Sequence, residues 1–440
     1  MNAPSERLTQ VGATMAALRL ELDFPRTSFD REGNIVGPPK AVFNNVRLIL
    51  QNDPYYAGRF SYCDFRAKLM WAPTPGGPME AFEDHHVDHL RAELASHWRL
   101  HLPVAVAYEA ARYVARGAPR HAVREYLTGL APWDGVRRLE RLLTGYFGAA
   151  DTALHREMGA RWMVSAIARV MAPPVKVDTV LVLRGSQGCG KSTFAKVLGG
   201  AWHRDTPISI GDKDAYLALR GAWIYELGEL ASTRKKEVEA VKAFISSEVD
   251  TVRLPYERMQ TELPRQCVFV GTTNEATFLN DPTGARRFWP VQVGTLDRAA
   301  LIADRDQLWA EALYRYRDAG GAPEAWLLPR EVEGALSEAH EEVTTVDPFE
   351  EAIDRNYFES KMLSSFEQNG LAMADLFHAL RIDPKDQHAG LDARLGNILR
   401  ARGWSKERRR GAQGRIWRWF PPTDAAPAAQ LPATEPSDPW

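Results

Sequence analysis

The chain has 440 residues, a formal net charge of -2 and 25% charged residues, so it is neither a short peptide nor basic throughout. This length accommodates about two to four domains, and any nucleic-acid surface must be a local cluster. The three cysteines, Cys63, Cys189 and Cys267, are odd in number and far apart, which excludes a disulfide framework or zinc pattern and fits a reducing cytoplasm. The polar N-terminus and the lack of any run of 18 apolar residues predict neither export nor a membrane span.

The pattern of apolar residues changes along the chain and predicts an α/β protein with several parts. Residues 1–110 combine short strand-like runs with Pro/Gly breaks and predict a mixed module. Residues 111–172 have the three- and four-residue apolar spacing of helices and predict a helical collar region. In 173–345, short Val- and Ile-rich runs alternate with helical segments, as in an α/β core with buried parallel strands. Residues 346–421 predict two helices and an aromatic strand, and the Pro/Ala-rich tail 422–440 is expected to be disordered.

The most specific motif is a phosphate-binding loop, Gly185-x-x-x-x-Gly190-Lys191-Ser192. It lies between an apolar run, 179–183, and an amphipathic helical pattern, 193–198. Glycines let backbone N–H groups point at phosphate oxygens, and the helix start adds partial positive charge. We expect ATP phosphates at Lys191 and Mg²⁺ at the Ser192 hydroxyl; a glycine-rich turn without a ligand is the disfavoured alternative. The predicted nucleotide-binding residues are Gly185, Ser186, Gln187, Gly188, Cys189, Gly190, Lys191, Ser192 and Thr193.

Three further segments supply groups that ATP hydrolysis needs. A predicted strand, Ala222–Tyr225, ends in Glu226, with Glu229 one turn later. One carboxylate can order the water shell of Mg²⁺ and the other can activate the attacking water; which glutamate does which stays open. The run QCVFVGTTN ends in Asn274, whose amide can contact the γ-phosphate, although a turn-forming asparagine gives the same pattern.

An arginine pair, Arg286 and Arg287, precedes an apolar strand in DPTGARRFWPVQV. A guanidinium entering the site of a neighbouring subunit can stabilise the charge of the transition state as an arginine finger. A salt bridge or a solvated loop is the alternative, and residue chemistry alone does not choose between the two arginines.

These motifs, together with HAVREYLTGLAPWDGVRRLERLL and VEAVKAFISSEVDTVRLPYERMQTELPRQCVFVGTTN, resemble the virulence-associated E family of phage and genomic-island proteins. That family is similar to superfamily 3 helicases of the AAA+ class, and the resemblance covers roughly residues 120–295. It implies a P-loop AAA+-like core with a five-stranded parallel sheet, self-association into rings that are often hexameric, and ATP-driven DNA unwinding. It places Lys191 and Ser192 at the Walker A positions, Glu226 at the Walker B acid, Asn274 at the sensor, and Arg286 or Arg287 at the finger.

The resemblance also implies a DNA-contacting hairpin between the Walker B and sensor segments. Lys242 and residues 252–259 fall on this motif, with Arg253, Tyr256 and Arg258 as candidate DNA contacts. An exposed hairpin whose charges only maintain solubility is the alternative. Many superfamily 3 proteins have two adjacent acids at Walker B, whereas here Leu227 follows Glu226. No carboxylate triad is evident upstream, so a primase would be a separate partner.

The segment RARGWSKERRRGAQGRIWRWF sets eight Lys/Arg against one glutamate and interleaves them with tryptophans. The predicted phosphate contacts are Arg408, Arg409, Arg410 and Arg415. Two amphipathic helices followed by a hairpin would make a winged-helix-like DNA-binding domain. The alternative is that the tryptophans form a core and the arginines a solvated rim.

The predicted function is an ATP-dependent DNA helicase that moves on single-stranded or forked DNA in the cytoplasm of a bacterial or phage-infected cell. Two alternatives stay open: a DNA-binding initiator that uses ATP as an assembly switch, and an interference or defence ATPase without translocation. A nucleotide kinase would leave the sensor, the arginine pair and the basic C-terminal segment unexplained.

Overall fold

The computed structural model describes residues 14–24, 28–29, 31, 35–210, 213–228, 235–253, 259–278, 285–344, 348–354, 370–411 and 414–421. Its contacts divide the chain into two compact units, Met1–Thr344 and Thr345–Trp440. Each unit has its own hydrophobic core. Within the described ranges, every helix is too short or too polar to cross a membrane.

The first unit begins with a mixed α/β module around a four-stranded sheet, ordered β5-β4-β3-β6, in which only the β3–β6 pair is parallel. A two-stranded pair, β1 and β2, precedes it. Helix α4 continues across residue 110, where the sequence pattern places a boundary, because Ala110, Ala111 and Ala115 are all buried in the core of this module. The elements of the module are β1 (Ser28–Phe29), β2 (Ile35–Val36), α2 (Phe43–Asn52), β3 (Phe60–Cys63), β4 (Lys68–Trp71), β5 (Glu80–Ala81), α3 (Asp84–Trp98), α4 (Val104–Arg116) and β6 (Pro119–Arg120).

The helical region that follows packs directly on the main sheet of the unit. The indole N–H of Trp162, in α7, donates to Phe269 O at 3.0 Å, and the indole N–H of Trp223 donates to Ala166 O at 2.9 Å. Helix α7 is buried along most of its length because its apolar residues do not keep to one side. The region consists of α5 (Ala122–Gly129), η1 (Leu139–Arg141), α6 (Leu142–Phe147) and α7 (Ala153–Met171).

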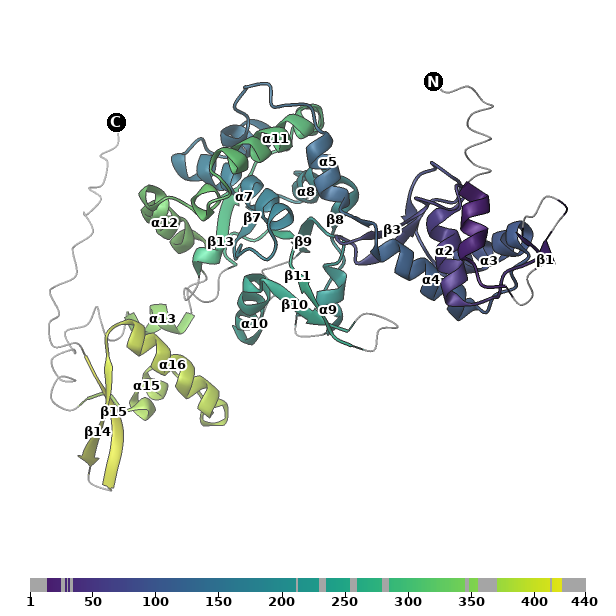
Figure 1. The fold of residues 1–440 in the computed structure, drawn as a ribbon. Coiled ribbons are helices and arrows are strands. Elements are labelled where there is room, and N and C mark those ends of the chain that lie inside the picture. Colours follow the sequence, from purple (N-terminus) through teal and green to yellow (C-terminus); the bar gives the residue numbers. More distant parts are fainter. Residues whose placement is uncertain are drawn as a thin grey trace. The chain divides into compact units, whose positions relative to one another are not determined.

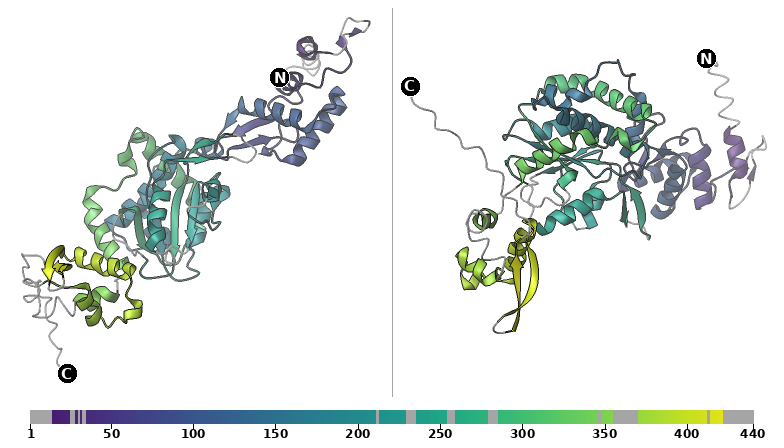
Figure 2. Two further views of the ribbon diagram at one scale, coloured as in Figure 1. Left: turned by 90° about the horizontal axis from the view of Figure 1, so that it is seen from below. Right: turned by 90° about the vertical axis from the view of Figure 1, so that its left-hand side faces the viewer.

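The main sheet has five strands in the order β13-β7-β12-β9-β8, and every neighbouring pair is parallel. The five-stranded parallel core implied by the family resemblance is therefore present (Figures 1 and 2). The strands are β7 (Val180–Arg184), β8 (His203–Arg204), β9 (Ile224–Gly228), β12 (Val268–Thr273) and β13 (Phe288–Gln292).

Both faces of this sheet are covered by helices, as expected for parallel strands that are apolar on both sides. Alternate residues of β7 point to opposite faces: Leu181 and Leu183 join a core with α7, α8 and α11, whereas Val180 and Val182 join a core with α9 and α10. The remaining elements of the unit are α8 (Lys191–Gly199), η2 (Gly200–Trp202), α9 (Lys213–Ala218), α10 (Lys235–Ser246), β10 (Val249–Val252), β11 (Thr261–Pro264), η4 (Ala285–Arg287), α11 (Arg298–Asp318), η5 (Pro323–Ala325), η6 (Arg330–Val332) and α12 (Glu333–Val343).

In the second unit, α15 and α16 are followed by the β14–β15 hairpin, in the predicted order, and a further helix, α13, precedes them. Trp404 and Trp419 are buried in its core, as the alternative interpretation of the basic segment requires, but Trp417 is 55% exposed. The tail 422–440 lies outside the described residues. The elements of the unit are α13 (Pro348–Ile353), α15 (Met373–Ala379), η8 (Pro384–Asp386), α16 (Ala389–Ala401), β14 (Ser405–Gly411) and β15 (Gly414–Phe420).

Candidate nucleotide-binding site and nucleic-acid surfaces

The loop between β7 and α8 turns at two glycines. Gly188 and Gly190 have φ values of +82° and +107°, in the left-handed region that glycine enters at little cost. A Cβ at Gly190 would also lie 2.7 Å from the Cβ of Leu296. The N–H of Leu296 donates to Cys189 O at 2.9 Å and so holds the loop at this point. Gly190 therefore meets two requirements, the backbone angle and the close approach, and α8 begins at the next residue.

The side chain of Lys191 folds back onto this loop. Its ammonium donates to Gly185 O at 2.7 Å, to Ser186 O at 2.9 Å and to Asn274 Oδ1 at 2.8 Å. Lys191 is buried, and no carboxylate pairs with it among the described residues. A buried charge is costly when it lacks an oppositely charged partner. The ammonium group is thus suited to an anionic ligand, and the structure brings Lys191 and Asn274 together.

Glu226 is the acceptor for three side chains from different elements. Ser192 Oγ, at the start of α8, donates to Glu226 Oε1 at 2.6 Å, and Thr272 Oγ1, in β12, donates to the same oxygen at 3.1 Å. His203 Nε2, in β8, lies 3.3 Å from Glu226 Oε2. Burial alone would raise the pKa of Glu226, but the hydrogen bonds from His203, Ser192 and Thr272 outweigh burial and lower the pKa below its ordinary value. Glu226 is therefore ionised at neutral pH.

The position of Glu226 differs from the sequence-based expectation in one respect. The strand predicted at 222–225, ending in Glu226, is β9 (Ile224–Gly228), so Glu226 lies in the middle of the strand and not at its end. Pairing with β12 continues past it, with Glu226 opposite Val270 and Gly228 opposite Thr272. Glu229 lies outside the described residues.

An open pocket of about 660 Å³ lies over these groups. Its volume is within the range of small-molecule sites. The pocket is lined by loop residues and by the carboxyl ends of β9 and β12, where parallel sheets bind ligands. Its lining residues are Gln187, Gly188, Gly190, Lys191, Ser192, Thr193, Glu226, Gly228, Thr272, Thr273, Asn274 and Glu275.

The residues of this pocket fit a nucleoside triphosphate with Mg²⁺. Lys191 and the glycine loop suit phosphate oxygens, and the Ser192 hydroxyl and Glu226 carboxylate are adjacent hard oxygen donors of the kind Mg²⁺ prefers. No group of three or more His, Cys, Asp or Glu that could hold a metal occurs in the part of the chain that the structure describes. Mg²⁺ does not need such a group, because it keeps several waters and takes further oxygens from phosphates.

The two candidate finger residues have different surroundings. The Nε of Arg287 donates to Ser246 Oγ, at the end of α10, at 2.9 Å and lies 3.8 Å from Asp178 Oδ2. Arg286 is exposed, and its guanidinium makes no hydrogen bond or ion pair with any residue in the described ranges. Arg287 is therefore held by contacts within its own chain, whereas Arg286 lies exposed at the surface.

The candidate DNA hairpin is the antiparallel pair β10–β11. Arg253, directly after β10, is exposed, whereas Lys242 in α10 is buried, so the structure does not bring these two side chains to one surface. Tyr256 and Arg258 lie outside the described residues. The base of the hairpin is fixed by Arg265, whose Nε and Nη2 donate to Asp250 at 3.1 and 2.5 Å and whose Nη1 donates to Phe244 O.

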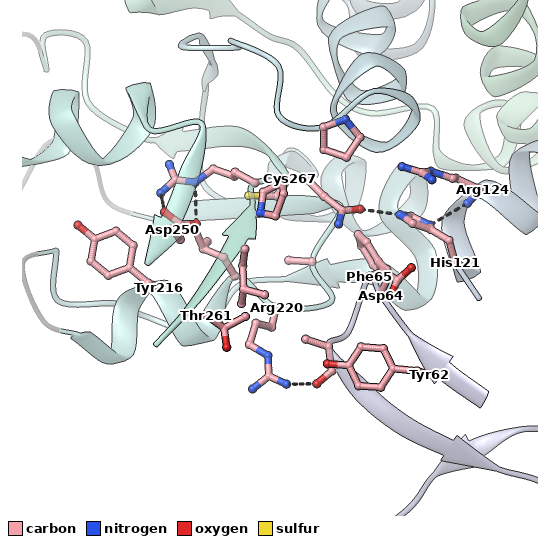
Figure 3. Close-up of a pocket in the computed structure, with 18 of the residues that line it drawn as sticks. Tyr62, Asp64, Phe65, His121, Arg124, Tyr216, Arg220, Asp250, Thr261 and Cys267 are labelled. Carbon is pink, nitrogen blue, oxygen red and sulfur yellow. Dashed lines mark hydrogen bonds and ion pairs between the residues drawn. The ribbon is translucent and has the colours of Figure 1, made fainter. Parts of the chain in front are cut away.

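A second pocket, of about 440 Å³, lies where the base of this hairpin meets the first module (Figure 3). Figure 3 shows Tyr62 and Asp64 on one side of it and Tyr216 and Asp250 on the other. His121 joins the two sides: its Nδ1 accepts from the Arg124 N–H at 3.2 Å, which leaves Nε2–H to donate to Gln266 Oε1 at 2.5 Å. Burial lowers the pKa of His121, so the ring is neutral at physiological pH.

The basic C-terminal segment forms the β14–β15 hairpin. Arg408 and Arg409 are exposed and, as neighbours in a strand, point to opposite faces. Arg409 pairs with Glu407 at 2.8 Å. Arg410 and Arg415 lie opposite each other in the register, and their side chains are outside what the structure describes.

His203 and Thr272 are site residues that the sequence analysis did not assign. Both contact Glu226 only because β8 and β12 lie on either side of β9. No local motif marks a single histidine in AWHRD as a partner of a glutamate 23 residues away.

Comparisons with known proteins agree with part of the sequence analysis. No curated protein matches the chain. Among solved structures, the apo structure of the NrS-1 C-terminal region (305-718) is similar with a TM-score of 0.48 and 12% identity, covering 85% of this chain and 98% of that one. Its A form gives a TM-score of 0.49 and 12% identity, covering 87% and 100%. The sequence profile of the virulence-associated protein E-like domain matches residues 127–345, and this part of the chain therefore belongs to the virulence-associated protein E-like family.

Proposed function

We propose that the chain is an ATP-dependent DNA motor, a helicase that acts in the replication of a phage or mobile element. The single observation that carries the proposal is the buried ammonium of Lys191, held by the glycine loop and Asn274 without an anionic partner among the described residues. The family assignment over residues 127–345 supports the same conclusion.

In the proposed site, Lys191 and the backbone N–H groups of the loop bind the phosphates. Mg²⁺, held by Ser192 and Glu226, would neutralise phosphate charge. The Glu226 carboxylate, ionised because three hydrogen bonds lower its pKa, orders water next to the γ-phosphate. Asn274 shares a hydrogen bond with Lys191 at 2.8 Å, and this contact must be rearranged when a phosphate takes the ammonium. Such a rearrangement would report the nucleotide state to β12.

The proposed DNA contacts are on the two hairpins. Arg253 is exposed next to β10, and the base of that hairpin is anchored to α10 through Arg265. Helix α10 in turn provides Ser246, which accepts from Arg287. These contacts form a continuous route between the arginine pair and the hairpin, and they support a mechanism in which hydrolysis moves the hairpin along one DNA strand. The ring assembly, with Arg286 supplied by a neighbouring copy, is part of the proposal.

The test compares wild type with Lys191→Ala in ATP binding, ATP hydrolysis with and without single-stranded DNA, and unwinding of a forked duplex. Lys191→Ala should abolish hydrolysis and unwinding while its melting temperature stays near that of wild type. Lys196→Ala, on the same helix and outside the pocket lining, is the matched control and should behave as wild type. An unchanged hydrolysis rate in Lys191→Ala would refute the site.

The alternatives make different predictions in the same experiment. An initiator that uses ATP as a switch should hydrolyse ATP in response to DNA without unwinding the fork. An interference ATPase that acts on protein should show hydrolysis that DNA does not stimulate. The mass of the assembly with and without ATP and DNA tests the ring, because a chain that stays monomeric leaves no neighbour to supply an arginine.

A further inference from the structure

The β14–β15 hairpin presents an exposed tryptophan with two cations close to its ring. Directly opposed residues of an antiparallel pair share one face, and the register opposes Lys406 to Trp419 and Arg408 to Trp417. The Nζ of Lys406 lies 5.5 Å from the centroid of the Trp417 ring, and the Cζ of Arg408 lies 6.0 Å from it. With 55% of its surface exposed, Trp417 keeps a large apolar ring in water.

The neighbouring tryptophan on the same face has a different role. Trp419 is buried against α16, where a Cβ on Gly396 would lie 2.9 Å from its Cζ2. This contact fixes the hairpin to the helix. Trp417 lies two residues further along the strand, a distance of roughly 7 Å, and the hairpin extends past the helices of this unit (Figures 1 and 2). Core packing therefore accounts for Trp419, whereas Trp417 lies outside the core that the described residues form.

The charges on this face are not compensated by carboxylates among the described residues of the unit. Neither Lys406 nor Arg408 forms an ion pair with a carboxylate in the described ranges, whereas Arg409, on the opposite face, pairs with Glu407 at 2.8 Å. An indole ring with cations beside it offers a flat surface next to sites for phosphates. Single-stranded nucleic acid presents the matching pattern, because an unpaired base exposes its flat face and is flanked by phosphates. In a duplex the same faces are covered by stacking.

We propose that Trp417 stacks on an unpaired base of single-stranded nucleic acid while Lys406 and Arg408 contact the flanking phosphates. This inference rests on the proposed function, in which the chain binds nucleic acid, and it specifies that the ligand is single-stranded. It places the stacking ring of Trp417 and the two cations on one face of the hairpin.

The test measures binding of the full chain to a labelled oligothymidylate of about 20 nucleotides by fluorescence anisotropy. Trp417→Ala should weaken binding by about 5- to 100-fold, the usual cost of removing one aromatic stacking residue, and Trp417→Phe should recover most of the affinity. Arg408→Ala should weaken binding and reduce the salt dependence by about one charge. Lys385→Ala, which removes an exposed lysine of the same unit that pairs with Asp383 at 3.5 Å, is the control and should change affinity little.

Two further probes separate stacking from other effects. A duplex of the same length should bind wild type and Trp417→Ala equally. An abasic strand, with the same phosphates and no bases, should also bind the two equally, because the stacking contact is then absent from both. An equal loss on the abasic strand, or unchanged affinity of Trp417→Ala for oligothymidylate, would overturn the proposal. If the stacking result holds while Lys191→Ala still hydrolyses ATP, the motor is refuted and the strand-binding face is not.

Discussion

Replacing Arg286 and Arg287 by alanine, one at a time, should separate a catalytic charge from a structural one. The two residues are adjacent in η4, yet only Arg287 has partners in its own chain among the described residues. The Arg287→Ala variant loses a hydrogen bond of 2.9 Å to Ser246 and a long ion pair of 3.8 Å to Asp178. Arg286→Ala loses no contact with the described residues, and in the proposed ring its effect on hydrolysis comes from the nucleotide site of the neighbouring copy.

The magnitudes follow from these contacts. A hydrogen bond from a charged donor contributes about 1.5 kcal/mol, and a long, partly exposed ion pair adds at most about 0.5 kcal/mol. Arg287→Ala should therefore destabilise the chain by about 2 kcal/mol, which lowers the melting temperature by about 4 °C or less in a unit of this size. Arg286→Ala should leave the melting temperature unchanged and lower kcat by about 10³- to 10⁵-fold, the usual effect of removing an arginine finger.

Subunit mixing shows whether the arginine acts in trans. Lys191→Ala chains have a defective nucleotide site but an intact Arg286, and Arg286→Ala chains have the reverse. Mixed in equal amounts, they should form wild-type sites at about one quarter of the interfaces and regain hydrolysis that neither variant shows alone. The control is a double variant that carries both changes in every chain. It should show no hydrolysis, because none of its interfaces combines an intact Lys191 with an intact Arg286.

Two results would refute this reasoning. A wild-type rate in Arg286→Ala would show that the exposed arginine has no part in hydrolysis. A large loss of rate in Arg287→Ala at an unchanged melting temperature would show that the contacts to Ser246 and Asp178 do not hold that side chain in the active assembly.

Three further changes test separate features. Glu226→Gln should retain ATP binding and lower hydrolysis by at least about 10²-fold, because the amide keeps the shape but loses the charge; a rate within twofold of wild type, measured by phosphate release, contradicts the assignment. Asp250→Asn should destabilise the chain by about 3–5 kcal/mol, because it leaves the guanidinium of Arg265, which is 2% exposed, without its anionic partner. Asp151→Asn, in an exposed ion pair, is the control and should change stability far less. Equal denaturant midpoints for the two variants would show that the buried pair does not stabilise the chain. Burial lowers the pKa of His121, so below about pH 6.5 the unfolded chain takes up a proton that the folded chain does not. The stability that depends on neutral His121 is complete above that pH and is lost as the pH falls toward the pKa of the folded state. In thermal melts between pH 7.5 and 5.5, the His121→Gln variant should therefore lose less stability than wild type.

The parts of the site that lie in one continuous segment could be predicted from the sequence. The glycines at 188 and 190 turn the loop through their own positive φ angles, and the lysine that follows them begins α8. Strand-like runs identified β7, β9, β12 and β13, because buried parallel strands are apolar on both faces. The end of β9 was misplaced, because Glu226 interrupts the apolar run while strand pairing continues to Gly228. A charged residue can remain in a buried strand when three side chains donate to it.

The parts that depend on strand order could not be predicted from one sequence. His203 reaches Glu226 because β8 pairs with β9 at the edge of the sheet. The choice between Arg286 and Arg287 depends on Ser246 and Asp178, which come from an α10 terminus and a segment before β7. The spacing of residues in the sequence does not indicate such contacts, and both arginines fit the same motif.

The position of β12 determines the geometry of the candidate site. It lies between β7 and β9, so its carboxyl end brings Thr272 to Glu226 and Asn274 to Lys191 at the same time. Ser192 bonds Glu226 from the other side, through the start of α8. Lys191 is thereby paired with the residue that follows β12, and Ser192 with a residue of β9. In the proposed function, a nucleotide replaces the Lys191–Asn274 and Ser192–Glu226 hydrogen bonds, and nucleotide binding is thereby coupled to the end of β12. Residues 265–267 join β11 to β12, so the strand that ends beside the candidate nucleotide pocket begins at the candidate DNA hairpin.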